Sequence, residues 1–133
     1  ENEFGGFGYS NKFEPFNEVE RASPDDFKKN TVIGVVATDA KLSKAQCKAF
    51  ATVAHDGITR AVFPSHTTFD GDLIFSVSTG EKELEENFND LLYINQAAAL
   101  CVSRSIARGV YHASNSPIDT FPSYKNKFKI KDL

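Results

Sequence analysis

The sequence predicts an α+β domain whose elements follow the order strand, helix, strand, helix. Two apolar runs of strand length, at 31–37 and 73–80, alternate with two longer stretches that carry apolar residues at helical spacing. At 133 residues, with 41% hydrophobic and 25% charged residues, the chain has the size and composition of one globular domain. This element order is typical of a βαβ unit, in which the two strands run parallel.

The segment 1–30, which precedes the first strand, has the composition of a loop-rich linker. It combines scattered glycine and proline residues with five phenylalanines, and it shows neither helical nor alternating periodicity. Aromatic residues are uncommon in disordered chains, so we expect this segment to lie across a protein surface.

The run "TVIGVVA" (31–37) is rich in β-branched residues and is typical of a strand buried on both faces. Asp39 is expected in the turn that follows. Ser43 lies three residues before Gln46, a spacing that predicts a capping box at the start of a helix, and Pro64 should end that helix. Its buried face should consist of Phe50, Val53, Ala54, Gly57, Ile58, Ala61 and Val62.

The run "LIFSVSTG" (73–80) predicts the second strand, closed by Gly80. A long helix should follow from about Glu86 to Ser114, with small residues at 97–99 that allow a close approach by a neighbouring element. The tail beyond this helix has loop character. Because two strands cannot form a stable sheet alone, we expect a larger sheet, completed by a partner chain or by missing sequence.

Composition excludes several classes of protein. A net charge of −3, a pI near 5.6 and the lack of a basic stripe argue against a nucleic-acid partner. No apolar run approaches the roughly 20 residues that span a membrane, and the first residues do not form a signal peptide. The lack of any methionine suggests a fragment or processed product. Cys47 and Cys101 are expected to be buried thiols in a reducing, cytoplasmic compartment.

Thr31 follows Asn30 at an abrupt change from charged to apolar sequence. If the Asn30–Thr31 bond were cut, the threonine hydroxyl could act as a nucleophile and its own α-amine as the base. Such an amine has an unperturbed pKa of about 7.7–8.0, which suits proton transfer near neutral pH. Self-cleavage would begin with attack of the hydroxyl on the Asn30 carbonyl. The alternative interpretation is a turn asparagine followed by a strand threonine.

Asp70 and Asp72 flank a glycine in "FDGD", directly before the second strand. Both carboxylates could project from one tight turn, where mutual repulsion would raise the pKa of one of them. The pair could then orient the Thr31 ammonium and shuttle a proton. An ordinary Asp-Gly turn and, more weakly, a Mg²⁺ or Ca²⁺ site are the alternatives.

The stretches "NTVIGVVATDAKLSKAQ", "AHDGITRAVFPSHTTFDGDLIFSVSTG" and "FPSY" together resemble the C-terminal half of the DmpA-type peptidase family. Within that family they look most like the threonine-nucleophile endo-type 6-aminohexanoate-oligomer (nylon-oligomer) hydrolases. The resemblance implies an Ntn-hydrolase-like αββα sandwich, of which this chain is the C-terminal part. Residues 1–30 would be the tail of the large part ahead of the cleavage site at Asn30 and Thr31. Residues 31–133 would form the small subunit.

The resemblance further implies a self-processing amidohydrolase that opens linear amide bonds, nylon-oligomer-like or peptide-like, through an acyl-enzyme on Thr31. Asp70 and Asp72 match the two acidic partners, and no metal or organic cofactor is implied. The large N-terminal subunit of the same precursor should supply a lysine and an oxyanion-binding asparagine, so activity would require assembly with it. The processed pair is expected to form a homo-oligomer. An acyltransferase of the ornithine acetyltransferase type and a non-catalytic assembly subunit are the alternatives.

The three histidines have weaker indications. His55 and Asp56 are adjacent in a predicted helix, where side chains point about 100° apart, so a packing contact is expected for His55. His66 lies in the loop before Asp70 and is the better candidate for a supporting role, although an ordinary loop residue is the preferred interpretation. His112 lies near the end of the second helix, where it would complement the helix dipole.

Overall fold

A parallel pair of strands connected by a helix forms one layer of the molecule. The computed structural model describes residues 31–85, 88–119 and 121–130, so Asn30 and the predicted linker at 1–30 lie outside the described residues. The elements are β1 (Ile33–Ala40), α1 (Lys44–Ala61), β2 (Leu73–Lys82), α2 (Phe88–His112) and α3 (Tyr124–Phe128). β1 pairs with β2 in parallel, which confirms the predicted βαβ unit.

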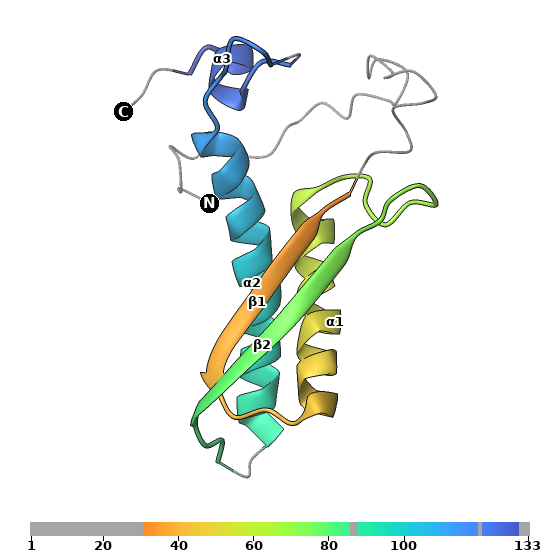
Figure 1. The fold of residues 1–133 in the computed structure, drawn as a ribbon, viewed down its shortest axis with the longest axis vertical. Coiled ribbons are helices and arrows are strands. Elements are labelled where there is room, and N and C mark those ends of the chain that lie inside the picture. Colours follow the sequence, from red (N-terminus) through yellow and green to blue (C-terminus); the bar gives the residue numbers. More distant parts are fainter. Residues whose placement is uncertain (1–30, 86–87, 120, 131–133) are drawn as a thin grey trace.

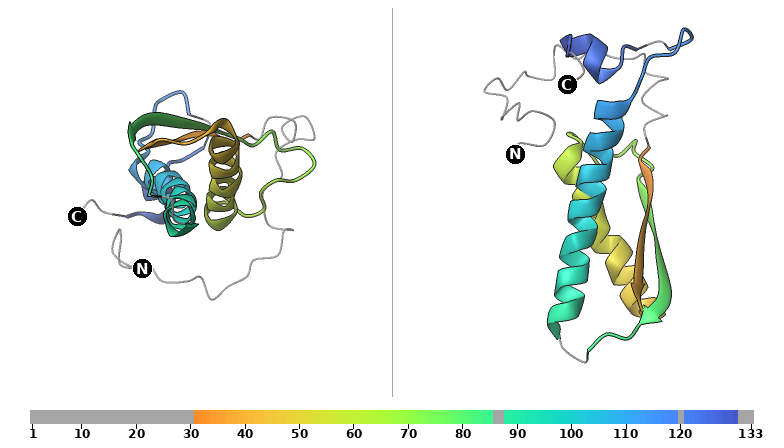
Figure 2. Two further views of the ribbon diagram at one scale, coloured as in Figure 1. Left: turned by 90° about the horizontal axis from the view of Figure 1, so that it is seen from below. Right: turned by 90° about the vertical axis from the view of Figure 1, so that its left-hand side faces the viewer.

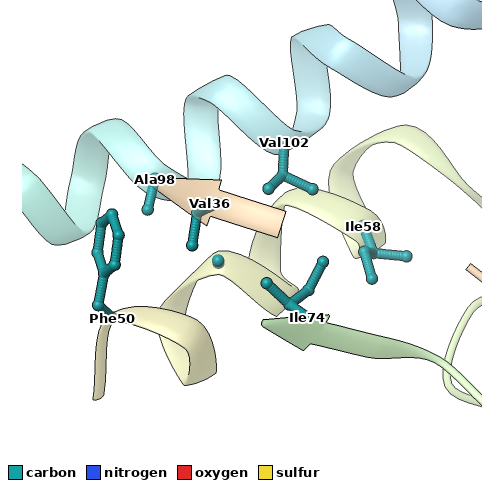
Figure 3. Close-up of a cluster of buried hydrophobic side chains, with 7 residues drawn as sticks. Val36, Phe50, Ile58, Ile74, Ala98 and Val102 are labelled. Atoms are coloured by element: carbon teal, nitrogen blue, oxygen red, sulfur yellow. The ribbon is translucent and has the colours of Figure 1, made fainter. Parts of the chain in front are cut away.

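Both long helices lie on the same face of this sheet (Figures 1 and 2), so the described residues form two layers. The core lies between the layers, where inward-facing residues of the strands meet one face of each helix (Figure 3). It consists of Val36, Phe50, Ala54, Ile58, Ile74, Ala98 and Val102. None of the described helices is long and apolar enough to cross a membrane.

The start of α1 confirms the predicted capping box. The Ser43 hydroxyl accepts a hydrogen bond from the Gln46 backbone N–H at 3.3 Å, and the Gln46 side chain accepts one from the Ser43 backbone N–H at 2.8 Å. The two bonds satisfy backbone groups that have no partner inside the helix. The helix ends at Ala61, three residues before Pro64, as expected from the proline.

The outer face of the sheet differs from the prediction that β1 is buried on both sides. Ile33 is 67% exposed, Val35 63% and Phe75 53%, because the described helices cover only the opposite face. Side chains alternate across a strand, so the exposed residues form one continuous apolar face. Its members are Ile33, Val35, Ala37, Leu73, Phe75 and Val77, which the register places in opposing pairs.

Three boundaries were also predicted wrongly, and one of them is the end of β2, which continues past Gly80 to Lys82. Asp39, expected in a turn, lies inside β1, because the pairing continues past an irregularity to join Ala40 with Lys82. An ion pair of 2.7 Å between Lys82 and Asp39 accompanies this extension. The tail, expected to be loop, forms the short helix α3, which Ser123 caps by accepting a hydrogen bond from the Asn126 N–H.

α1 packs tightly against α2 at Gly57. A Cβ atom added there would lie 2.4 Å from the Ala99 carbonyl oxygen and 2.6 Å from Val102 Cβ. The small residues predicted to permit close packing therefore do so. We expect Gly57→Ala to lower the free energy of unfolding by about 1–3 kcal/mol through overpacking.

Chemical denaturation of the two variants Gly57→Ala and Gly109→Ala tests this expectation. Gly109 also lies within a helix, but an added Cβ there meets no atom within 4 Å. Alanine at position 109 should therefore leave the protein as stable or stabilise it by up to about 1 kcal/mol. Equal stability of both variants would contradict a tight contact at Gly57.

Candidate active site

Thr31 and the loop segment 70–72 lie side by side at one end of the sheet because the two strands are parallel and in register. Ile33 pairs with Leu73, so the residues that immediately precede β1 lie beside those that precede β2. Figure 1 shows the start of β1 next to the loop that joins α1 to β2. The hydrogen bond from the Leu73 N–H to the Val32 carbonyl oxygen, 2.9 Å long, extends the pairing by one further residue.

The Thr31 side chain lies against the glycine between the two aspartates. A Cβ atom added to Gly71 would lie 2.9 Å from Thr31 Oγ1 and 3.7 Å from Thr31 Cγ2. An approach this close requires a residue without a side chain. Thr31 is itself an exposed residue. The Asp-Gly-Asp motif therefore forms the surface on which the predicted nucleophile lies.

Asp72 is a nearly buried carboxylate, only 6% exposed, that joins two segments. Its Oδ1 accepts a hydrogen bond of 2.9 Å from the Val32 backbone N–H. Its Oδ2 lies 2.7 Å from His66 Nδ1 and accepts a bond of 3.3 Å from the His66 backbone N–H. Oδ1 thus binds the residue that follows Thr31, and Oδ2 binds the loop at His66.

These contacts decide the charge of Asp72. Burial raises the pKa of Asp72, but the backbone hydrogen bonds from Val32 and His66, and the charge and hydrogen bond of the His66 ring, together lower that pKa by more. The pKa of Asp72 therefore lies below its usual value, and the group is ionised at neutral pH. The sequence left open which carboxylate of the pair would have a raised pKa, and Asp72 is not that group.

Asp70 has a different environment. Its Oδ2 accepts a hydrogen bond of 2.7 Å from the Thr67 N–H, and its own N–H donates to the Thr67 carbonyl oxygen at 3.1 Å. These two bonds close a tight turn over residues 67–70. Among the described residues, Asp70 Oδ1 has no hydrogen-bond donor, so this oxygen is available to a ligand or to a neighbouring amine.

His66 is closer to the site than sequence reasoning could show. Its φ of 54° is a left-handed conformation, and its ring lies between Asp72 and the ring of His55 on α1, with 5.2 Å between the two ring centroids. The packing contact expected for His55 is thus made with His66. Sequence spacing could not indicate that the two rings and the carboxylate would meet, because they come from separate elements.

A groove of about 470 Å³ starts beside the site and runs along the free edge of β1. Its floor is the backbone of β1 from Val32 to Thr38, and α2 forms its wall with residues that include Ala98, Cys101 and Ile106. In the described part of the chain β1 pairs only with β2, so its second edge presents unpaired backbone groups to the groove.

Comparison with known proteins relates this chain to a family of peptidases. The family described as "Peptidase family S58" matches residues 5–119. A Mycobacterium tuberculosis protein named as an uncharacterized aminopeptidase is 37% identical over 109 aligned residues, which cover 74% of this chain and 31% of that protein. Its Mycobacterium leprae counterpart is 35% identical over the same length, with 74% and 30% covered. The chain thus spans about a third of the length of these relatives.

A 6-aminohexanoate-oligomer endohydrolase of Agromyces sp. is also similar, at 33% identity over 66 residues, covering 50% of this chain and 19% of that enzyme. The mycobacterial alignments cover a larger share of this chain than the endohydrolase alignment does. The predicted likeness to DmpA-type peptidases and to the oligomer hydrolases is confirmed. With the family match extending over most of its length, this chain belongs to peptidase family S58.

Proposed function

We propose that this chain carries the nucleophile of a self-processing amidohydrolase, with Thr31 as the catalytic residue once the Asn30–Thr31 bond has been cut. The observation that supports this most strongly is the contact of the exposed Thr31 side chain with Gly71, between Asp70 and Asp72. The names of the relatives, aminopeptidase and oligomer endohydrolase, both describe hydrolysis of amide bonds. An amide substrate, peptide-like or oligoamide, is therefore the class that we propose.

Self-processing would use the same hydroxyl. Thr31 Oγ1 attacks the Asn30 carbonyl carbon, the C–N bond to Thr31 breaks, and the Asn30 acyl group is left as an ester on Oγ1. Water then hydrolyses that ester, which releases the Asn30 carboxylate and leaves Thr31 with a free hydroxyl and a free amine. The amine is the base that the later reaction requires.

In each catalytic turnover, the Thr31 amine would accept the hydroxyl proton while Oγ1 attacks the carbonyl carbon of the substrate amide. The amide C–N bond then breaks, the leaving amine takes that proton, and the acyl group remains as an ester on Thr31. Water hydrolyses the ester to the acid. The unoccupied oxygen of Asp70 could bind the Thr31 ammonium, whereas both oxygens of Asp72 are engaged in holding the backbone.

Release of acid from a linear 6-aminohexanoate oligomer and from an aminoacyl anilide, each with and without added hydroxylamine, tests the reaction type. A hydrolase should release acid from at least one of these substrates without the added amine. Product that forms only when the amine is present would replace the proposal with an acyltransferase. A fully processed protein that acts on neither substrate would contradict the proposed substrate class.

The outer face of the sheet and the groove indicate how the rest of the enzyme would bind. The apolar face defined above is too large and continuous for a protein surface that remains in water. The free edge of β1 can add a strand through backbone hydrogen bonds. We propose that both are covered by a large N-terminal subunit, equivalent to the two-thirds of the relatives that this chain does not match. A homo-oligomer of the processed pair remains part of the proposal.

The cysteines provide a readout of this assembly. Both are free thiols, and Cys101, which was expected to be buried, is exposed because it lines the groove. In the assembled protein we expect Cys101 to be protected from a thiol reagent. The cytoplasmic location expected from these thiols stays a prediction.

Phe75→Asp should prevent assembly, because it places a charge in the centre of the apolar face. We expect the two parts to separate on gel filtration and Cys101 to become reactive. Thr52→Asp is the control, since Thr52 is an exposed residue of α1 that hydrogen-bonds only to its own helix. Normal assembly of the Phe75→Asp protein would show that this face is not the interface.

A further inference from the structure

His66 connects the first helix to the backbone of the proposed nucleophile. Its ring packs against the His55 ring of α1 on one side and bonds to the Asp72 carboxylate on the other, at 2.7 Å. The same carboxylate accepts the Val32 N–H. A continuous set of contacts therefore runs from α1 through two side chains to the residue that follows Thr31.

The Val32 N–H belongs to the peptide plane that it shares with the Thr31 carbonyl group. The peptide unit is planar, so a hydrogen bond that holds its N–H also holds the orientation of the whole plane. Thr31 Cα lies in that plane, and its position is therefore set as well. The Val32 carbonyl is held in turn by the Leu73 N–H of β2. Asp72 and β2 together thus anchor the backbone on both sides of Val32, one residue from the hydroxyl.

The backbone at His66 requires support of its own. A φ of 54° lies in the left-handed region, which costs free energy for a residue other than glycine, although histidine adopts it more often than most residues do. Here the Asp72 carboxylate binds both the ring and the backbone N–H of His66. The strained residue and the carboxylate therefore fix each other's position.

We propose that His66 is a positioning residue, which holds Asp72 in the orientation that fixes the Val32 peptide and so places Thr31 Oγ1 over Gly71. This inference rests on the proposed function of Thr31 and extends it to a residue outside the Asp-Gly-Asp motif. The contacts of His66 Nδ1 and of both Asp72 oxygens all hold the loop or the Val32 backbone, which is a positioning role.

Two substitutions at His66 separate its ring from its backbone conformation. Glycine accepts a positive φ readily but removes the bond to Asp72, whereas asparagine tolerates the same φ and offers a side-chain N–H close to the place of Nδ1. We expect His66→Gly to lower kcat about tenfold to a hundredfold, as small displacements of a nucleophile do, with KM unchanged. His66→Asn should restore kcat to near the wild-type value.

The matched control is Thr68→Gly, which adds the same backbone freedom to an exposed position of the same loop. It should leave kcat near the wild-type value. Wild-type kcat in His66→Gly would overturn the positioning role. Loss of kcat in both His66 variants would also overturn it, since the imidazole itself would then be required.

Failure of this inference can be told apart from failure of the proposed function. All variants are made in the complete protein, and the cleaved fraction of each is measured so that kcat refers to the cleaved form. Thr31→Ala, which should remain uncut, is assayed beside them. If Thr31→Ala is inactive while His66→Gly retains full activity, the nucleophile stands and the positioning role is wrong. If Thr31→Ala is active, the proposed function is wrong, whatever the His66 variants do.

Discussion

Replacing Thr31 with alanine is expected to abolish both self-cleavage and amide hydrolysis. The substitution removes the only group that can attack either the Asn30 carbonyl or the substrate in the proposed mechanism. The uncut chain also lacks the free amine that serves as the base. Loss of the nucleophile in a hydrolase lowers kcat by about 10⁴-fold or more, so residual turnover should be undetectable in an ordinary assay.

Two further substitutions make this result specific. Thr31→Ser keeps a hydroxyl at the same place and should preserve cleavage and turnover, although more slowly. Thr52→Ala removes an exposed hydroxyl that bonds only to the Lys48 carbonyl of its own helix, and it should change neither property. A Thr31→Ala protein that is cleaved and hydrolyses amides would remove the basis for the proposed function.

Gly71→Ala should produce the second-largest loss of activity, although it removes no functional group. The added Cβ would lie 2.9 Å from Thr31 Oγ1, so either the hydroxyl or the loop must move. In the described part of the chain only Gly80 is a glycine with positive φ, so alanine at position 71 adds a methyl group without straining the backbone. A displacement of about 1 Å at a nucleophile can cost about a hundredfold in rate.

The measurement for Gly71→Ala is kcat together with thermal unfolding. Gly71 is exposed, so we expect the unfolding temperature to change little while kcat falls. Gly109→Ala, in open space on α2, should keep both values near those of the wild type. If Gly71→Ala kept the wild-type kcat, Thr31 would not need to lie against the Asp-Gly-Asp turn.

Much of the fold could be predicted from local patterns. The capping box at Ser43, the close packing at Gly57 and the parallel strands follow from spacing and from residue size. The exposure of the outer face of β1 could not be predicted in the same way. A run of β-branched residues indicates apolar surroundings, but it does not indicate whether the same chain or another one provides them. The extension of β1 through Asp39 involves pairing with the far end of the other strand, where Lys82 lies beside Asp39.

The candidate site could be predicted only in part for the same reason. Thr31 and the Asp-Gly-Asp motif could be paired because a parallel βαβ unit brings the starts of its strands together. The different environments of Asp70 and Asp72 could not be predicted, because they depend on a turn closed by Thr67 and on the His66 ring. Sequence spacing contains no information about which carboxylate is buried.

The central claim is that Thr31 becomes a chain terminus, and the intact mass of the purified complete protein under denaturing conditions tests it most directly. We predict a separate fragment that begins at Thr31 in wild-type protein, and a single uncut chain in Thr31→Ala. An uncut wild-type chain that hydrolyses amides would contradict the account, because Thr31 would then lack the free amine on which the mechanism depends.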